Sequence, residues 1–207
     1  MPTLGVDDED ALDAATAALR AGELVVLPTD TVYGLAALAG HAGAAQRIFG
    51  AKGRPDRLPL PVLASSLDQV RQLGVEIPAA AAALAAQWWP GPLTMAFGFS
   101  ASAPRPPWLS GRDEVAVRIP QHPFLLALLR RSGPLLVTSA NRHGAPTPSA
   151  AADAAAPLAA HVALVVDGGI CAGAPSTLVN VRGPHPVVER EGAIPAEAVG
   201  GALERPA

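Results

Sequence analysis

The chain has 207 residues, half of them hydrophobic and 4% aromatic, and its formal net charge is −3. This length and hydrophobicity fit one globular domain and exclude a disordered chain. The acidic balance argues against the overall basic field of a nucleic-acid-binding protein, although arginines can still gather in a local basic cleft. The single cysteine, Cys171, excludes an intramolecular disulfide and a cysteine-rich zinc site.

The N-terminus is acidic and lacks the apolar region of a signal peptide. No apolar run reaches the roughly 18 residues that a membrane-spanning helix needs. We therefore expect a cytoplasmic protein with no membrane partner. We expect a single domain over residues 1–207, with its core at about 9–195.

Hydrophobic periodicity and turn residues predict helices and strands in alternation along the chain. The first helix is expected at residues 9–21, capped by Asp7 or Asp8 and stopped by Gly22, and a buried strand follows at 24–27. Further helices are predicted at 42–49, 66–73, 78–88, 123–131, 150–160 and from 195 onward. Further strands are predicted at 61–64, 93–99, 115–119, 135–138, 162–166, 177–181 and 186–190.

This alternation predicts an α/β fold. It becomes irregular near residues 91–119 and 177–190, which indicates some antiparallel strand pairs. We therefore expect a twisted, mixed parallel and antiparallel sheet flanked by helices, with an open cleft, rather than a regular doubly wound sheet.

Three polar loops, at residues 28–34, 139–144 and 167–176, each follow a predicted strand. In open α/β sheets, ligands bind beyond the carboxyl ends of the strands. The loops and their flanks carry small hydroxyl, amide and glycine residues, which suit phosphate and carboxylate oxygens: Thr29, Thr31, Ser139, Asn141, Gly144, Ser149, Gly168, Gly169, Ser176 and Thr177. The alternative is that these residues only close turns.

Lys52 is the only lysine among the 15 lysine and arginine residues. In a chain so rich in arginine, a single lysine indicates a position that arginine does not serve, because an ammonium is a point charge and a guanidinium is a planar fork. Arg54 follows two residues later, and phosphate sites often combine the two groups. The alternative is an ordinary solvated lysine in a loop.

Several common signatures are missing from the sequence. It has no P-loop, no dinucleotide-binding glycine motif, no GxSxG elbow and no histidines at metal-ligand spacing. The residues alone therefore predict an anion-binding α/β protein whose chemistry needs neither a protein nucleophile nor a protein metal cage.

Six motifs, taken in order, resemble the YrdC/TsaC family of threonylcarbamoyl-AMP synthases, in its short bacterial form. They are PTDTVYGL at 28–35, KGRP at 52–55, WPGPLT at 89–94, VAVRIP at 115–120, TSAN at 138–141 and PST at 175–177. The resemblance covers residues 9–195 and implies a single YrdC-like domain.

The resemblance implies a nucleotidyltransferase that condenses L-threonine, bicarbonate and ATP to L-threonylcarbamoyladenylate and releases pyrophosphate. The product would serve the t6A37 modification of tRNA, so that tRNA would be an indirect or weak partner and other proteins of the t6A pathway would be partners too. Mg²⁺ would enter with ATP. A carbamate formed from the substrates is the nucleophile, so the enzyme needs mainly positioning and charge stabilisation.

The resemblance also assigns site residues. Those implied to hold L-threonine are Thr31, Arg118, Ser139 and Ser176. Those implied to hold ATP are Lys52, Arg54, Asn141, Ser149 and Arg190. Arg118 suits the threonine carboxylate as a bidentate clamp, and Lys52 and Arg54, nearest the phosphates, would be the catalytic residues.

The chain departs from the family pattern at three places. Leu58 and Leu63 stand where many relatives have an asparagine that contacts ATP and a histidine that contacts threonine, and leucine cannot make those polar bonds. Glu114 stands where a threonine often contacts ATP, and a carboxylate there would repel phosphates. Residues 143–144 read His-Gly in place of Ser-Gly.

Two other functions remain open. One is a non-catalytic RNA-binding module of the same fold, which the sequence pI of about 5.9 and the lack of an RNA-binding motif argue against. The other is a carbamoyl-transfer enzyme of the hydrogenase-maturation type, which the short length and the single cysteine argue against.

Overall fold

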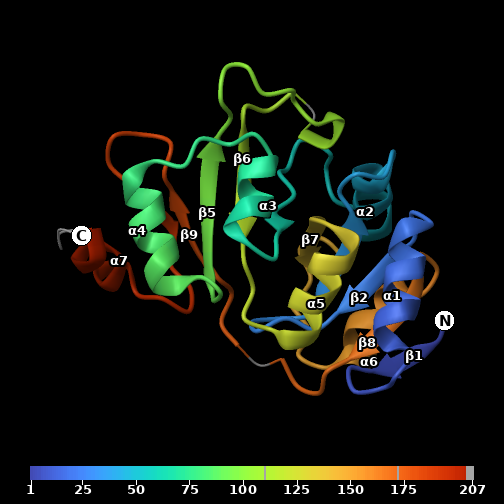
Figure 1. The fold of residues 1–207 in the computed structure, drawn as a ribbon. Helices are drawn as coiled ribbons and strands as arrows, with labels where there is room; N and C mark the ends of the chain where they lie inside the picture. The colour runs from blue at the N-terminus through green and yellow to red at the C-terminus, as the bar shows by residue number, and fades with distance from the viewer. Residues whose placement is uncertain (110, 172, 204–207) are drawn as a thin grey trace.

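The computed structural model describes residues 1–109, 111–171 and 173–203. Within them, ten strands form one sheet in the order β1-β8-β2-β3-β7-β4-β6-β5-β9-β10 (Figure 1). The strands are β1 (Thr3–Gly5), β2 (Leu24–Leu27), β3 (Gly34–Leu38), β4 (Val62–Leu63), β5 (Leu93–Gly98), β6 (Glu114–Arg118), β7 (Leu135–Ser139), β8 (Val162–Asp167), β9 (Thr177–Asn180) and β10 (Val187–Arg190).

Parallel and antiparallel pairs are mixed in this sheet, so the predicted α/β class is confirmed. Strand β8 pairs in parallel with β1 and β2, and β6 and β9 pair in parallel with β4 and β5. The remaining neighbours are antiparallel. In Figure 1, β5 and β9 stand upright whereas β2 runs obliquely, as expected of a strongly twisted sheet.

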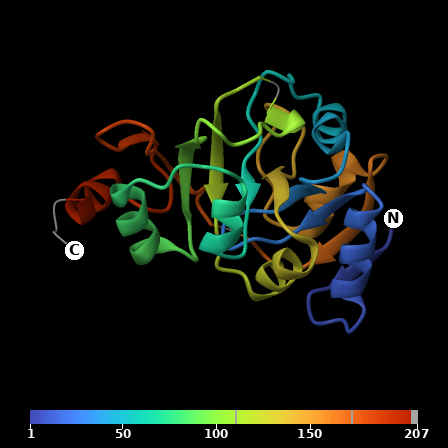
Figure 2. The same ribbon diagram turned by 45° about the horizontal axis from the view of Figure 1, so that its top comes forward.

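Seven α-helices lie in the described part of the chain. They are α1 (Ala11–Arg20), α2 (Ala44–Lys52), α3 (Leu67–Gln72), α4 (Ala79–Trp88), α5 (Pro123–Ser132), α6 (Ala151–Ala155) and α7 (Ala196–Leu203). Strand β1 and helix α7 lie at opposite ends of the molecule (Figure 2). None of the helices described is long and apolar enough to cross a membrane.

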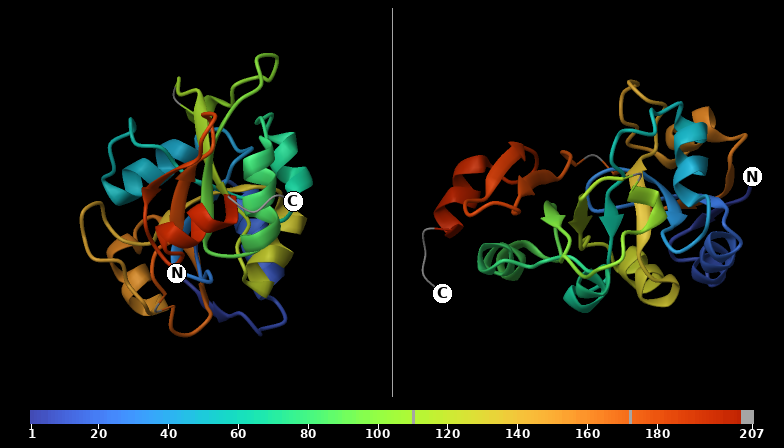
Figure 3. Two further views of the ribbon diagram at one scale, coloured as in Figure 1. Left: turned by 90° about the vertical axis from the view of Figure 1, so that its left-hand side faces the viewer. Right: turned by 90° about the horizontal axis from the view of Figure 1, so that it is seen from above.

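The two faces of the sheet pack against different helices. On one face, side chains of β2, β3, β4, β5, β6 and β7 form the larger core with α2, α4 and α6. On the other face, a smaller core joins α1 and α5 to β2, β3, β7 and β8. Figure 3 shows α1 and α5 side by side at one end of the sheet. This second face therefore has helices over only part of its width.

Sequence patterns missed two strands. Strand β3 reads GLAAL and lacks the β-branched and alternating residues that mark a half-buried strand. It forms because β2 and β7 flank it on both edges and both of its faces are buried. Strand β1 has only three residues and pairs only with β8.

Three local expectations were wrong. Asp7 and Asp8 do not cap α1: the residue at the cap is Asp10, and Asp8 Oδ2 instead accepts a bond from the Gly5 N–H at 2.7 Å. Helix α2 runs on through Gly50 to Lys52 and is capped by Gly53, whose φ of +62° is the left-handed conformation that glycine adopts readily. Lys52 is therefore the last residue of a helix, not part of a loop.

The segment after β10 folds back onto the start of β9. The buried Thr177 hydroxyl donates to the Ile194 carbonyl at 2.6 Å and accepts from the N–H groups of Gly192 and Ile194, both at 3.0 Å. The N–H of Ala193 donates to the Pro175 carbonyl at 2.9 Å. The backbone at Gly192 approaches so closely that a Cβ atom there would overlap the Pro175 carbonyl oxygen.

We predict that Gly192→Ala lowers the free energy of unfolding by about 1–3 kcal/mol, the usual cost of overpacking. The clash is with backbone, which cannot rotate away. Urea denaturation of the wild type and the variant measures this difference.

Gly200→Ala is the matched control. Gly200 lies inside α7 with no atom within 4 Å of an added Cβ, so alanine should raise stability by up to about 1 kcal/mol. Equal effects of the two substitutions would contradict the close approach at Gly192.

Candidate functional site

A cavity of about 380 Å³ opens on the sheet face that carries α1 and α5, next to the part that these helices cover. Six of the nine predicted site residues line it: Thr31, Arg54, Arg118, Ser139, Ser176 and Arg190. The other three, Lys52, Asn141 and Ser149, are not among its lining residues. The three predicted polar loops therefore meet at one place, at the edge of the central strands.

Alternation along the strands makes the floor of the cavity. In β6, Val115 and Val117 point into the larger core, whereas Ala116 and Arg118 line the cavity. In the neighbouring strand β5, Thr94 lines the cavity in the same way. Because Ala116 is small, the floor leaves free space in front of the Arg118 guanidinium.

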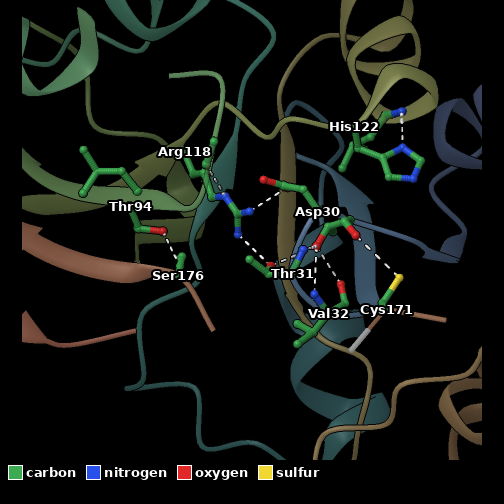
Figure 4. Close-up of polar contacts among 12 residues, drawn as sticks. Asp30, Thr31, Val32, Thr94, Arg118, His122, Cys171 and Ser176 are labelled. Atoms are coloured by element: carbon green, nitrogen blue, oxygen red, sulfur yellow. Dashed lines mark hydrogen bonds and ion pairs between the residues drawn. The ribbon is translucent and has the colours of Figure 1, made fainter. Parts of the chain in front are cut away.

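Arg118 is buried, with only 6% of its surface exposed, and residues of two segments far apart in the chain hold its side chain. Nε donates to the Gly91 carbonyl at 2.9 Å, and Nη1 donates to Thr31 Oγ1 at 2.8 Å. Nη2 lies 2.6 Å from Oδ1 of Asp30 (Figure 4). A guanidinium has five N–H groups, so at most three are occupied and the others can receive a carboxylate.

Asp30 is the main residue that the sequence analysis missed. Its side chain is 13% exposed and lies next to Arg118, and its two oxygens are buried without an aligned hydrogen bond from any described residue. Burial lowers the pKa of Arg118, and the nearby Asp30 charge opposes that shift. The signal was available, because Asp30 is the only acidic residue in the PTDTVYGL motif, beside a predicted carboxylate-binding loop.

Thr29 shapes the loop that carries Asp30. Its hydroxyl oxygen accepts from the N–H groups of Thr31 and Val32 at 3.0 and 3.1 Å, as in a side-chain-closed turn. The third polar loop also contacts this one, because the Cys171 thiol lies 3.5 Å from the Thr29 carbonyl. This turn fixes the direction in which Thr31 faces Arg118.

The buried Tyr33 hydroxyl connects the first polar loop to the third. It accepts from the Gly168 N–H at 3.1 Å and lies 2.7 Å from the Gly169 carbonyl and 3.0 Å from Asp167 Oδ1. Burial raises the pKa of Tyr33 above its ordinary value, so the hydroxyl keeps its proton as a donor. The segment Asp167-Gly168-Gly169 is therefore held by the side chain of Tyr33, which lies in the loop that leads into β3.

Ser176 stands opposite Arg118 across the floor. Its Oγ lies 2.7 Å from Thr94 Oγ1, and Figure 4 shows the two hydroxyls pointing toward one another. Arg190 Nη2 donates to the Ser176 carbonyl at 2.8 Å, so the returning β10 segment holds this serine in place. The signal for Thr94 was present at the end of the WPGPLT motif.

Lys52 is buried at 2% exposure, so its interpretation as a solvated lysine is wrong. Its ammonium donates to the main-chain carbonyls of Ser139 and Asn141 from below. Burial, with a smaller contribution from the Arg54 charge, lowers the pKa of Lys52 to about 8. Lys52 thus holds the loop after β7 and places a positive charge beneath it.

The remaining ATP-site candidates differ in position. Arg54 lines the cavity and donates to the Pro59 carbonyl at 2.9 Å. Asn141 is buried, and its amide donates to the carbonyls of Arg142 and Ala145, at 2.9 and 2.7 Å. Ser149 is exposed, and its backbone carbonyl accepts from the Cys171 N–H at 2.8 Å.

The departures from the family pattern have distinct positions. Leu63 lines the cavity and gives it an apolar wall beside Arg118, its partner across the β4–β6 register. Leu58 is half-buried outside the lining. The Glu114 carboxylate pairs with Arg182, so this acid is neutralised rather than directed into the cavity.

Nothing in residues 1–109, 111–171 and 173–203 brings three His, Cys, Asp or Glu side chains together as a metal cage. The cavity instead offers hydroxyls and guanidinium groups, which are donors suited to carboxylate and phosphate oxygens. Such an arrangement can bind and orient anionic substrates and stabilise charge that develops between them.

Comparison with known proteins places this cavity in context. The Sua5/YciO/YrdC family model, described as "Telomere recombination", matches residues 17–192. The threonylcarbamoyl-AMP synthase of Bacillus subtilis is 39% identical over 198 residues, which are 95% of this chain and 57% of that protein. The chain thus spans little more than half the length of this relative.

Two solved structures share the fold. Pyrococcus abyssi Sua5 complexed with L-threonine matches with a TM-score of 0.91 and 37% identity, over 99% of this chain and 61% of that one. Escherichia coli YciO matches with a TM-score of 0.83 and 25% identity, over 95% and 96% of the two chains. The second match shows the same architecture in a protein of similar length.

We predict that Asp30→Ala lowers the free energy of unfolding by about 3–5 kcal/mol, because it leaves the buried Arg118 cation without its counter-charge. Denaturant titration at neutral pH gives the value. Asp68→Ala is the control, since the Asp68–Arg71 pair is exposed and its loss should change stability by no more than about 0.5 kcal/mol. A loss below about 1 kcal/mol for Asp30→Ala would show that the pair contributes no more than a surface one.

Lys52 predicts a pH effect on stability. Between pH 8 and its ordinary pKa of 10.5, Lys52 is protonated in the unfolded chain and mostly neutral in the folded protein. The unfolded state then binds more protons, so this residue makes the free energy of unfolding rise with pH across that window. Well below pH 8 Lys52 is protonated in both states and its contribution is constant.

Comparison with Lys52→Met isolates this contribution, because Tyr33 and Cys171 titrate equally in both proteins. We expect the free energy of unfolding of the wild type, minus that of Lys52→Met, to increase as pH rises from 7 to 10. A difference that stays constant over this range would mean that Lys52 keeps an ordinary pKa.

Proposed function

Because the chain belongs to the Sua5/YciO/YrdC family, we propose that it is an L-threonylcarbamoyladenylate synthase, a nucleotidyltransferase that joins L-threonine, bicarbonate and ATP. The observation that carries this proposal is the buried Arg118 guanidinium, held with free N–H groups facing a cavity of hydroxyls. The names of the relatives support the same reaction.

L-threonine would bind over the floor of the cavity. Its carboxylate would take the free N–H groups of Arg118, and its amine and hydroxyl would face Thr31, Ser139 and Ser176. Leu63 would pack against the threonine methyl group, in place of a polar contact. The likeness to Sua5 with L-threonine supports this placement.

The reaction needs no protein nucleophile. The threonine amine and bicarbonate form a carbamate and water, and a carbamate oxygen attacks the α-phosphorus of ATP while the bond from that phosphorus to pyrophosphate breaks. Arg54 would contact the phosphates from the cavity wall. The Lys52 charge would act from beneath the 139–141 loop, which it holds in place for Asn141 to meet the nucleotide.

Ser149 and Arg190 would complete the nucleotide site from the two sides of the opening. Mg²⁺ would arrive as part of MgATP, its oxygen ligands coming from the phosphates. We propose that the product passes to tRNA modification at t6A37 and that the protein works in the cytoplasm with other t6A-pathway proteins. Nothing in the relatives' names favours the RNA-binding alternative.

We expect the purified protein to release pyrophosphate from MgATP only when both L-threonine and bicarbonate are present. A coupled pyrophosphate assay, with each substrate omitted in turn, measures this requirement. Pyrophosphate release that ignores threonine, or no release from folded protein, would contradict the proposed reaction.

Arg118→Lys should lower kcat/KM for L-threonine by at least about 30-fold, or about 2 kcal/mol, because lysine keeps the charge but loses the planar fork. Arg131→Lys is the matched control, since Arg131 forms a half-exposed surface pair with Asp13 and should keep wild-type activity. Activity of Arg118→Lys within threefold of wild type would remove Arg118 from the threonine site.

A further inference from the structure

Two arginines lie close together, one of them in the cavity lining, although 58 positions separate them in the chain. Arg54 lines the cavity and is half-buried. Arg112 reaches the same segment, because its Nη1 donates to the Arg57 carbonyl at 3.0 Å. The two guanidinium groups are close enough that the Arg112 charge, after burial, helps to lower the pKa of Arg54.

No acid compensates this cluster among the described residues. The ion pairs found there use Arg47, Arg71, Arg118, Arg131 and Arg182, and none involves Lys52, Arg54, Arg57 or Arg112. The two acids next to Arg112 in the chain, Asp113 and Glu114, are both bound to Arg182. A chain with a net charge of −3 therefore keeps an uncompensated positive region beside its cavity.

The two arginines also have unused donors. Nε of Arg54 and Nε of Arg112 are both buried, and neither has a hydrogen-bond acceptor among the residues that the structure describes. Donors left unpaired in this way cost free energy, and so does holding two like charges together. An anion with several oxygens would relieve both costs, because it brings acceptors and opposite charge to the same place.

We propose that Arg112 and Arg54 together form a polyphosphate subsite, which binds the phosphates of ATP beyond the α-phosphate and the pyrophosphate they become. This inference deepens the proposed function and rests on it for the identity of the nucleotide. The chemistry favours a short, highly charged phosphate chain, because Arg54 lines the cavity and Arg112 lies next to it, bound to the Arg57 carbonyl.

The test measures binding, not turnover. Isothermal titration calorimetry compares inorganic tripolyphosphate with AMP, which lacks the outer phosphates. The main variant is Arg112→Gln, which removes the charge and the guanidinium donors but keeps a polar side chain. We expect tripolyphosphate and ATP to bind at least tenfold more weakly to this variant, with AMP affinity within twofold of wild type.

Arg71→Gln is the matched control. It removes one exposed arginine from α3 with the same change in net charge, and should leave tripolyphosphate affinity within twofold. Arg112→Lys should restore part of the lost affinity, because it restores the charge without the fork. An unchanged melting temperature of Arg112→Gln would separate lost binding from a lost fold.

Three results would overturn the subsite: no tripolyphosphate binding by the wild type, tripolyphosphate affinity of Arg112→Gln within twofold of wild type, or equal losses for tripolyphosphate and AMP. A tenfold loss for single-stranded RNA with none for tripolyphosphate would also overturn it, in favour of a nucleic-acid contact. If tripolyphosphate binding is lost as predicted but no pyrophosphate is ever released, the anion subsite stands and the synthase reaction fails.

Discussion

The site depends on how the protein keeps one guanidinium buried. Taking a cation out of water is costly unless opposite charge and hydrogen-bond acceptors surround it. Asp30, Thr31 and the Gly91 carbonyl supply these to Arg118, and they come from two loops that lie far apart in the chain. Because the partners also restrict rotation of the side chain, Arg118 presents its remaining N–H groups in one direction, as a preorganised clamp should.

The sheet makes room for that clamp by leaving part of one face without a helix. Helices α1 and α5 pack against β8, β2, β3 and β7, and the cavity is lined by residues of β4, β5, β6 and β9 and by the neighbouring ends of β3 and β7. Small or hydroxyl-bearing residues on that face, such as Ala116 and Thr94, keep the space open and polar. The same strands turn large apolar side chains to the opposite face, so stability and ligand access are provided by opposite sides of the same strands.

Charge is distributed in a similar way. Most acidic partners lie at the surface, in pairs such as Asp13–Arg131 and Asp68–Arg71, while no acid among the described residues pairs with Lys52 or Arg54. The local basic cleft that the sequence allowed is therefore present in an acidic protein. An anion bound in such a site would interact with cations that have no acidic partner nearby, and preorganised charges of this kind stabilise bound negative charge strongly.

Much of this could be predicted from the sequence, because most strands and helices carry their own periodicity and stop signals. The polar loops were found in the same way, as small polar residues after strands, whereas Arg118 was assigned through the resemblance of its VAVRIP motif to the YrdC/TsaC family. Strand β3 could not be predicted, because it forms through pairing with β2 and β7 and its own residues are not typical of a strand. Asp30 and the burial of Lys52 were missed for a related reason: both depend on contacts between residues more than 80 positions apart.

The central claim is that Arg118 binds the amino-acid carboxylate. The most direct measurement is a crystal structure of the protein with L-threonine and a non-hydrolysable ATP analogue. The account predicts the threonine carboxylate on the Arg118 guanidinium, at N···O distances of about 2.7–2.9 Å, with Asp30 still paired behind it. Threonine bound elsewhere in the cavity, with Arg118 contacting only protein atoms, would contradict it.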